Sequence, residues 1–363
     1  MPFSRYMELC LYAPELGYYQ QARERFGRAG DFYTSSDVHA VFGRLLCNQF
    51  QEMWRVMGAT GQLDLVELGP GRALFAADVL DWAGKRHPEF AWALRYRLVE
   101  GSEHLHARTA ERVREHLGAG RASVHESLGG AEVECSDNVI VFANEFFDAL
   151  PVEIVTTEGM IVVGVEGERF VEESVPLPTE IADYLDRFSC HPEPGERREV
   201  CPGALRWTEK IARVFTDGGR RGFCLFIDYG YTRQEQLAGR HLDTLMTYQR
   251  HRAGTDPYAA PGDEDMTAHV NFTALAAAAE RAGLKAEPLL TQAQLLLGIG
   301  EPSRFADVLE ASAVAQEKAK MLMQLKHLIA PEGMGETFRA LVLSKGIEPD
   351  AVRALSGLSF LRR

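Results

Sequence analysis

The order of hydrophobic and polar positions predicts an α/β protein. Short apolar runs typical of buried strands occur at residues 63–68, 95–100, 122–125 and 139–143. Between them, apolar residues recur at three- and four-residue steps, and the clearest such helix begins at Ser35 or Ser36 and ends at Gly58. Strands that alternate with helices in this way predict a mostly parallel central sheet covered on both faces.

The second half of the chain interrupts this alternation. Apolar residues at 152–175 are mixed with glycines, which predicts antiparallel hairpins. Polar, turn-rich residues 231–268 predict a long functional loop. The remaining expected elements are helices at 3–11, 72–86, 179–189, 203–216, 271–282 and 303–329, and strands at 222–227 and 338–343, with loop at 191–199.

These elements predict three regions. Residues 1–58 form an N-terminal helical extension with a loop over the cofactor. Residues 59–151 and 219–363 form the core, and residues 152–218 form an inserted hairpin and helix region for the substrate.

Composition and charge narrow the class of protein. The 52 acidic and 39 basic residues give a formal net charge of −13. Phosphate binding rests on clustered Lys and Arg, so we expect neither a nucleic acid nor a membrane as partner. The six cysteines form no C-x-x-C pair, and no cluster has the spacing of metal ligands, so we expect reduced thiols and no metal. With no secretory signal or long apolar run visible, the sequence predicts a cytoplasmic protein.

A glycine turn follows the first strand of the core, in the segment Glu67-Leu68-Gly69-Pro70-Gly71. Such a turn lets a ligand approach the backbone near a helix N-terminus. A dinucleotide site would need a third glycine where Leu74 stands, and no Gly-Lys-Ser/Thr follows for a nucleotide phosphate loop. Both alternatives are therefore disfavoured.

S-adenosylmethionine fits the turn better, because it has no pyrophosphate and needs acidic partners for its ribose and amino group. Glu67 comes at the end of the first strand. Glu100 comes at the end of the second strand, where its carboxylate could accept from both ribose hydroxyls. The alternative is a tight strand–helix turn with two solvated acids.

The chain also resembles the MidA family of class I S-adenosylmethionine-dependent methyltransferases, which includes arginine methyltransferases that assist assembly of mitochondrial complex I. The matching segments are Tyr6-Met7, Gly17-Tyr18-Tyr19, Gly30-Asp31-Phe32-Tyr33-Thr34-Ser35-Ser36, Phe42-Gly43, Val66 to Arg72, Asn144 to Val152, Asp228-Tyr229-Gly230, Thr267 to Phe272 and Met334-Gly335-Glu336-Phe338. They span nearly the whole chain in family order. One departure is Ala73, where the family usually has glycine.

The resemblance implies a Rossmann-like methyltransferase fold and S-adenosyl-L-methionine as cofactor. It implies a cofactor loop over the adenosine, although Phe32 could equally fill the core. The cofactor-binding residues that we predict are Gly30, Asp31, Phe32, Thr34, Glu67, Gly69, Pro70, Gly71, Glu100 and Asn144.

The resemblance further implies an arginine side chain of a protein as methyl acceptor. A protonated guanidinium needs a carboxylate that holds it by paired hydrogen bonds and helps to take up the proton. We predict that Glu145 does this with help from Asn144 and Asp148, and that His269 is a candidate proton acceptor. Structural alternatives remain open: a solvated loop acid for Glu145, a turn cap for Asp148 and a structural role for His269.

Two other functions remain open at this point. The acceptor could be a small molecule that offers oxygen, nitrogen or sulfur, or the chain could be an assembly protein that keeps the fold and transfers nothing. A homodimer also remains open.

Overall fold

The structure is a computed structural model that describes residues 1–21, 40–132, 135–249, 252–309 and 314–362. The chain forms two compact units. The hairpin unit holds residues 1–32, 145–210 and 229–278, and the sheet unit holds 33–144, 211–228 and 279–363. In this division residues 1–21 and 229–249 fall in the hairpin unit, and residues 40–58 fall in the sheet unit.

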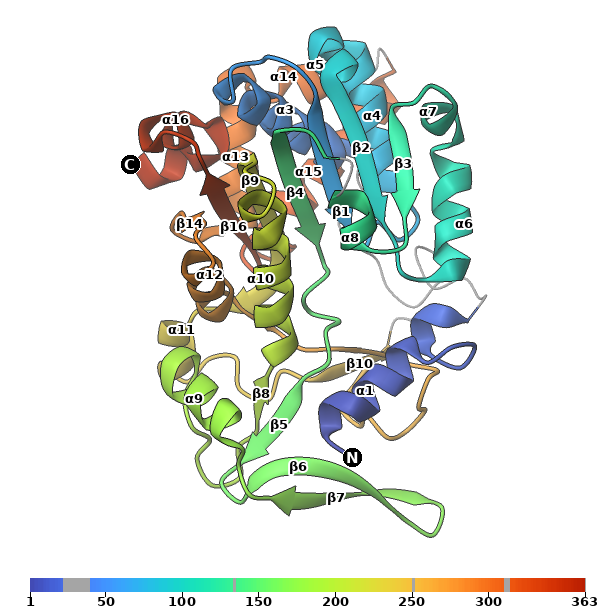
Figure 1. Ribbon diagram of the computed structural model, residues 1–363, viewed down its shortest axis with the longest axis vertical. Helices are drawn as coiled ribbons and strands as arrows, with labels where there is room; N and C mark the ends of the chain where they lie inside the picture. The colour runs from blue at the N-terminus through green and yellow to red at the C-terminus, as the bar shows by residue number, and fades with distance from the viewer. Residues whose placement is uncertain (22–39, 133–134, 250–251, 310–313, 363) are drawn as a thin grey trace. The chain divides into compact units, whose positions relative to one another are not determined.

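The sheet unit is built on a central sheet with the strand order β14-β16-β9-β4-β1-β2-β3 (Figure 1). The strands are β1 (Leu63–Leu68), β2 (Leu94–Val99), β3 (Ala122–His125), β4 (Asn138–Asn144), β9 (Arg221–Tyr231), β14 (Lys285–Ala286), β15 (Leu290–Thr291) and β16 (Phe338–Lys345). β1, β2, β3, β4 and β9 pair in parallel, whereas β14 and β15 pair antiparallel to β16. The predicted mostly parallel α/β sheet is therefore confirmed.

The strand order reverses between β1 and β4. The chain passes from β1 outward to β2 and β3, then returns to β4 on the other side of β1. In open α/β sheets, ligands bind beyond the carboxyl ends of the strands at such a reversal. Leu68 is in register with Val99 and Ala143, so the carboxyl ends of β1, β2 and β4 meet at one edge.

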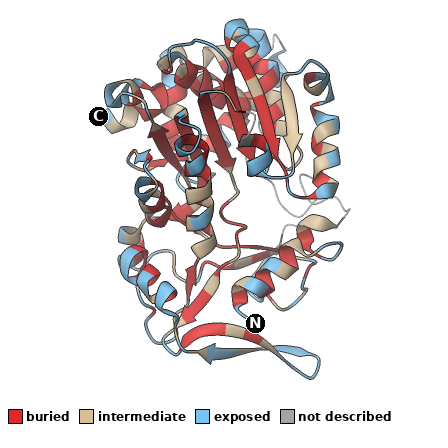
Figure 2. Ribbon diagram, viewed as in Figure 1, coloured by how far each residue is buried: buried red, intermediate tan, exposed pale blue. Residues whose placement is uncertain are grey.

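Helices cover this sheet. They are α3 (Ala40–Val56), α4 (Leu74–Arg86), α5 (Pro88–Ala93), α6 (Glu103–Arg112), α7 (Arg114–Gly118), α8 (Leu128–Glu132), α13 (Gln292–Gly300), α14 (Ala306–Leu309), α15 (Ala315–Ile329) and α16 (Pro349–Ala354), with 3₁₀ turns η3 (Glu301–Ser303) and η4 (Ser356–Arg362). A Cβ on Gly43 of α3 would lie 2.7 Å from the Asp78 Cβ, so this glycine permits close packing of α3 on α4. The rings of Phe75 of α4 and Phe142 of β4 stack on each other, with their centroids 4.5 Å apart. Figure 2 shows the central strands as buried.

The hairpin unit contains a four-stranded sheet, β7-β6-β5-β8, and a three-stranded sheet, β11-β10-β12. Its strands are β5 (Glu153–Thr156), β6 (Gly159–Glu166), β7 (Arg169–Val175), β8 (Arg198–Val200), β10 (Met246–Gln249), β11 (Arg252–Gly254), β12 (Asp265–Thr267) and β13 (Val270–Asn271). The hairpins expected at 152–175 are confirmed as β5, β6 and β7, which pair antiparallel.

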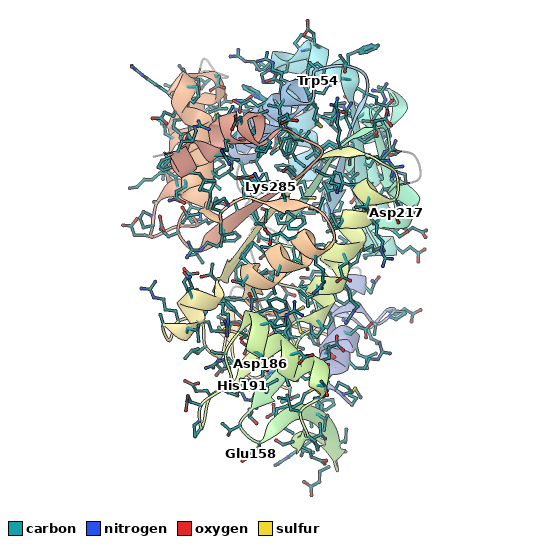
Figure 3. The ribbon with its side chains drawn as sticks, turned by 60° about the vertical axis from the view of Figure 1, so that its left-hand side comes forward. Trp54, Glu158, Asp186, His191, Asp217 and Lys285 are labelled. Carbon is teal, nitrogen blue, oxygen red and sulfur yellow. The ribbon has the colours of Figure 1, made fainter. Side chains whose placement is uncertain are left out.

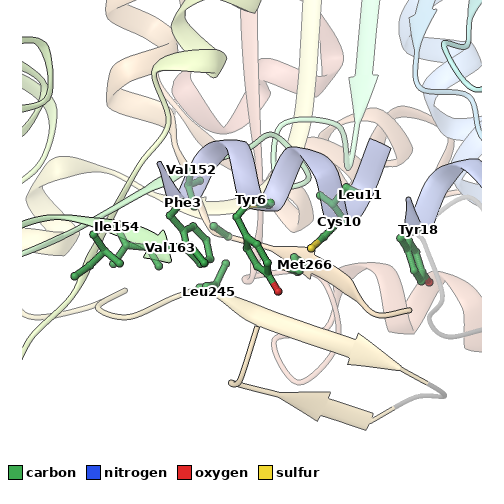
Figure 4. Close-up of a cluster of buried hydrophobic side chains, with 13 residues drawn as sticks. Phe3, Tyr6, Cys10, Leu11, Tyr18, Val152, Ile154, Val163, Leu245 and Met266 are labelled. Carbon is green, nitrogen blue, oxygen red and sulfur yellow. The ribbon is translucent and has the colours of Figure 1, made fainter. Parts of the chain in front are cut away.

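The helices of the hairpin unit are α1 (Phe3–Tyr12), η1 (Tyr18–Gln20), α9 (Thr179–Phe188) and α11 (Arg233–Leu237). Two further helices are α10 (Pro202–Thr216) and α12 (Phe272–Arg281). Each of them begins in the hairpin unit and ends in the sheet unit along the sequence. At the end of α9, the exposed Asp186 and His191 side chains lie 2.8 Å apart (Figure 3). The unit has its own apolar core, in which α1 packs Phe3, Tyr6 and Leu11 against β5, β6 and β12 (Figure 4).

Several expected elements differ from the structure. The segment 231–268 is not a plain loop, because it contains α11 and three short strands, β10, β11 and β12. Strand β8 lies partly in the expected loop at 191–199, and the helix expected at 303–329 is divided into α14 and α15. Helix α13 was missed because its run Leu295-Leu296-Leu297 has no amphipathic period, although Thr291 and Gln294 form a capping box at its start. Within the described residues, no helix has the length and apolar character needed to cross a bilayer.

Candidate active site

The glycine turn joins β1 to α4 at the carboxyl edge of the sheet. Gly69 and Gly71 have φ angles of +65° and +53°, in the left-handed region that glycine adopts most readily. The Gly69 N–H donates to the Val99 carbonyl at 3.0 Å, and Thr109 Oγ1 donates to the Gly71 carbonyl at 2.7 Å. These bonds tie the turn to the end of β2 and to α6.

Glu100 follows β2 directly and is buried beside this turn. The Ser102 N–H donates to Glu100 Oε1 at 2.9 Å. Burial raises the pKa of Glu100 to about 7, although hydrogen bonds from the backbone of Ser102 and Gly71 lower it. A carboxylate that is costly to ionise in the protein alone is well suited to a ligand that brings hydroxyl donors.

Glu67 is the penultimate residue of β1 and is also buried. The Tyr96 hydroxyl donates to Glu67 Oε2 at 2.8 Å. Burial raises the pKa of Glu67 to about 8, Tyr96 lowers it, and the charge of Glu100 raises it further. Two buried acids with raised pKa values at adjacent strand ends favour a binding site over two solvated acids.

Ala73 occupies the last position of the turn with φ +53° and is fully buried. Its N–H donates to the Pro70 carbonyl at 2.8 Å, and its carbonyl accepts from the Ala77 N–H of α4. An L-residue in this conformation costs roughly 1–2 kcal/mol, which a glycine would not. The departure from the family pattern therefore falls on a strained backbone position.

Replacing Ala73 by Gly should relieve this strain. The gain of roughly 1–2 kcal/mol is partly offset by about 0.4–1 kcal/mol from greater freedom of the unfolded chain. We expect the free energy of unfolding to rise by roughly 0.5–1 kcal/mol, as measured by urea denaturation. The matched control is Ala77→Gly within α4, which should lower it by about 1 kcal/mol. An equal loss of stability in both variants would contradict a strained backbone at Ala73.

A second group of candidates follows β4. Asn144 is the last residue of β4 and is in register with Ile227 of β9. Glu145 comes next, half-buried, with φ +50°. A glutamate in the left-handed region is uncommon, and such strain concentrates at functional sites.

Asp148 is buried in the hairpin unit. The Tyr229 hydroxyl donates to Asp148 Oδ2 at 2.6 Å, and the Asp148 carbonyl accepts from the Ala268 N–H at 3.0 Å. Burial raises the pKa of Asp148 to about 6, although Tyr229 and nearby backbone N–H groups lower it. The carboxyl group is thus held in place, and it titrates close to neutral pH.

His269 lies between β12 and β13. Its Nδ1 lies 2.9 Å from the Nδ1 of His241, and the Tyr229 ring packs edge-on against it at 5.4 Å. Burial and the neighbouring His241 lower the pKa of His269 to about 4, so it is neutral at physiological pH. The structure therefore brings Asp148, Tyr229, His269 and His241 together.

His241 was missed by sequence reasoning. It stands 28 residues before its partner in a polar segment, and no local pattern marks it. The predicted residues Gly30, Asp31, Phe32 and Thr34 lie outside the described residues. Within the described part of the chain, no group of three or more His, Cys, Asp or Glu residues could hold a metal ion.

Comparison with known proteins defines the class. Residues 45–289 match a family described as putative S-adenosyl-L-methionine-dependent methyltransferases, and the chain belongs to this family. The resemblance to MidA proteins is confirmed by curated relatives. They include the mitochondrial protein arginine methyltransferase NDUFAF7 of Homo sapiens (29% identity over 94% of this chain and 79% of the relative) and its homologue in Drosophila melanogaster (28%, 96% and 82%).

A solved structure is similar over almost the whole chain. It is a likely methyltransferase of the COG1565 superfamily from Burkholderia thailandensis, bound to S-adenosyl-homocysteine. The TM-score is 0.81 at 29% identity, covering 99% of this chain and 90% of that one. S-adenosylmethionine as cofactor is therefore supported. The cytoplasmic location predicted from the sequence is contradicted by the curated relatives, which are named as mitochondrial, and we withdraw it.

The residues present fit this cofactor. The turn at Gly69 and Gly71 lies at the carboxyl edge of the sheet, and the buried carboxyl groups of Glu67 and Glu100 are acceptors at the same edge. S-adenosylmethionine presents matching donors, namely two ribose hydroxyls and an ammonium group.

Proposed function

We propose that the protein transfers a methyl group from S-adenosylmethionine to the guanidinium group of an arginine in a protein acceptor, and that Glu145 holds this guanidinium. The observation that carries the proposal is the left-handed backbone of Glu145, directly after the strand-end residue Asn144. The names of the curated relatives support arginine as the acceptor.

In this proposal the sheet unit holds the cofactor. Glu100 accepts from the ribose hydroxyls, the backbone of Gly69, Pro70 and Gly71 lines the ligand, and Glu67 and Asn144 bind its polar groups. The cofactor, when bound, would supply a methyl group from its sulfonium, and the neutral thioether of S-adenosylhomocysteine would be the leaving group.

Glu145 and Asp148 are the residues that this proposal assigns to the acceptor. The two oxygens of Glu145 accept paired hydrogen bonds from the guanidinium and keep one nitrogen aligned for in-line attack. That nitrogen gains the methyl group and gives up a proton. Asp148, with a pKa of about 6, is mostly ionised at neutral pH and can receive this proton, while Tyr229 fixes its orientation.

The test is identification of the methylated group. The purified protein and tritiated S-adenosylmethionine are incubated with an extract of source cells that lack the protein, and acid hydrolysates of the labelled protein fraction are separated. We expect the label in methylarginine. Label in a small molecule, or in another amino acid only, would overturn the proposal and leave the methyltransferase class intact.

A further inference from the structure

A small cavity lies inside the hairpin unit, next to the histidine pair. Its polar lining includes Glu199, Cys201, Tyr231, His269 and Asn271. The cavity measures about 10 Å³, which is close to the space that one water molecule needs. It is therefore too small for a guanidinium or any organic ligand.

Glu199 of β8 is 4% exposed and lines this cavity. Its Oε2 accepts from Thr244 Oγ1 at 2.9 Å, whereas its Oε1 has no hydrogen-bond partner among the described residues. A buried carboxyl oxygen without a partner is destabilising, so such atoms usually bind water.

Thr244 also links Glu199 to His269 directly. The backbone N–H of His269 donates to Thr244 Oγ1 at 3.2 Å, and the same hydroxyl donates to Glu199. The threonine thus fixes the carboxyl group and the histidine backbone relative to each other, on opposite sides of one hydroxyl.

We propose that Glu199 is a positioning residue for His269, which it holds through Thr244 and through one water in the cavity that bridges Glu199 Oε1 to the imidazole. This inference rests on the proposed function, because it assigns His269 to the uptake of the proton that the methylated guanidinium releases. The contact of Tyr229 with both Asp148 and His269 places the histidine next to the first proton acceptor.

The charged groups around His269 determine whether replacing Glu199 raises or lowers the pKa of the histidine. His241 lies against it, Tyr229 and Tyr231 pack around the pair, and Asp148 accepts from Tyr229. Burial raises the pKa of Glu199, the hydrogen bonds of Thr244 lower it, and Asp243 raises it further. Glu199 is the buried carboxyl group that shares the cavity with His269, and in its ionised form it favours the imidazolium form of the histidine. Removing that charge lowers the pKa of His269 and makes it a weaker proton acceptor.

The test compares Glu199→Gln with Glu193→Gln, a matched change on an exposed residue of the preceding loop. For Glu199→Gln we expect kcat/KM to fall roughly tenfold. We also expect the acid limb of its pH profile to move to lower pH and the His269 resonance to titrate at lower pH in a ¹³C-histidine spectrum. Glu193→Gln should match the parent protein in all three measurements.

A purely structural role would lower the melting temperature of Glu199→Gln but leave the pH profile and the His269 titration unchanged, which would overturn the inference. The histidine titration needs no acceptor, so it reports on Glu199 even if arginine methylation itself is disproved. If Glu199→Gln does not fold, Thr244→Val removes the same link and is expected to give a shift of the same sign.

Discussion

Replacing Glu145 by Gln is expected to lower kcat for methyl transfer roughly 10²–10⁴-fold. An amide offers one acceptor oxygen and presents N–H donors to a guanidinium that has only donors, so the paired hydrogen bonds are lost. Affinity for S-adenosylhomocysteine should not change, because Glu145 is assigned to the acceptor. The measurements are single-turnover transfer rates beside calorimetric titration with S-adenosylhomocysteine.

The backbone of Glu145 allows a second, independent variant. Glu145→Gly removes the carboxylate and also the left-handed strain at φ +50°. We expect it to be as inactive as Glu145→Gln but more stable, by up to about 1 kcal/mol in the free energy of unfolding. If Glu145 both lowers the stability of the protein and is required for the rate, then the strain of its backbone serves the reaction.

The control for both variants is Glu158→Gln, an exposed glutamate in the turn between β5 and β6 (Figure 3). It should retain the full rate and stability. A Glu145→Gln protein that keeps most of its rate would return Glu145 to the role of a solvated loop acid, and the acceptor-binding carboxylate would have to be sought elsewhere.

The parallel strands could be predicted from sequence because burial on both faces leaves continuous apolar runs. Val139 to Ala143 is such a run, and β4 contains it. Short elements inside polar segments carry no comparable signal. β10 and β12 are paired with each other over only three residue pairs, from Met246–Thr267 to Tyr248–Asp265, and their partners lie far apart in sequence.

The candidate site residues likewise divide into those that a local sequence feature marks and those that it does not. Glu67, Gly69 and Glu100 could be proposed because strand ends and a glycine turn are local features that the sequence displays. The His241–His269 pair and the Glu199–Thr244 bond join residues 28 and 45 positions apart, so only tertiary structure brings them together. The strain at Ala73 and Glu145 is likewise invisible in the sequence, since neither residue type signals a left-handed backbone.

The second large effect is expected on cofactor binding when Glu100 is replaced. We expect Glu100→Gln to raise the Kd for S-adenosylhomocysteine roughly 10–100-fold, which corresponds to about 1.4–2.8 kcal/mol. The reason is that an ionised carboxylate can accept from two ribose hydroxyls, whereas an amide has one acceptor oxygen. Glu103→Gln, an exposed position three residues further on at the start of α6, is the matched control and should bind as the parent protein does.

The pH dependence of S-adenosylhomocysteine binding tests whether the charge of Glu100, and not only the shape of its side chain, holds the ribose. Burial raises the pKa of Glu100 to about 7 in the protein alone, so the carboxyl group is increasingly protonated below that pH and must lose its proton to accept from both hydroxyls. The parent affinity should therefore fall about tenfold per pH unit below pH 7, with release of about one proton on binding. In Glu100→Gln this step should be absent, while any step from Glu67 should move below pH 8, because the charge of Glu100 helps to raise the pKa of Glu67. Calorimetry between pH 5.5 and 9, in buffers of different ionisation enthalpy, measures both quantities. A parent Kd that stays constant below pH 7 would show that Glu100 does not hold the ribose through its charge.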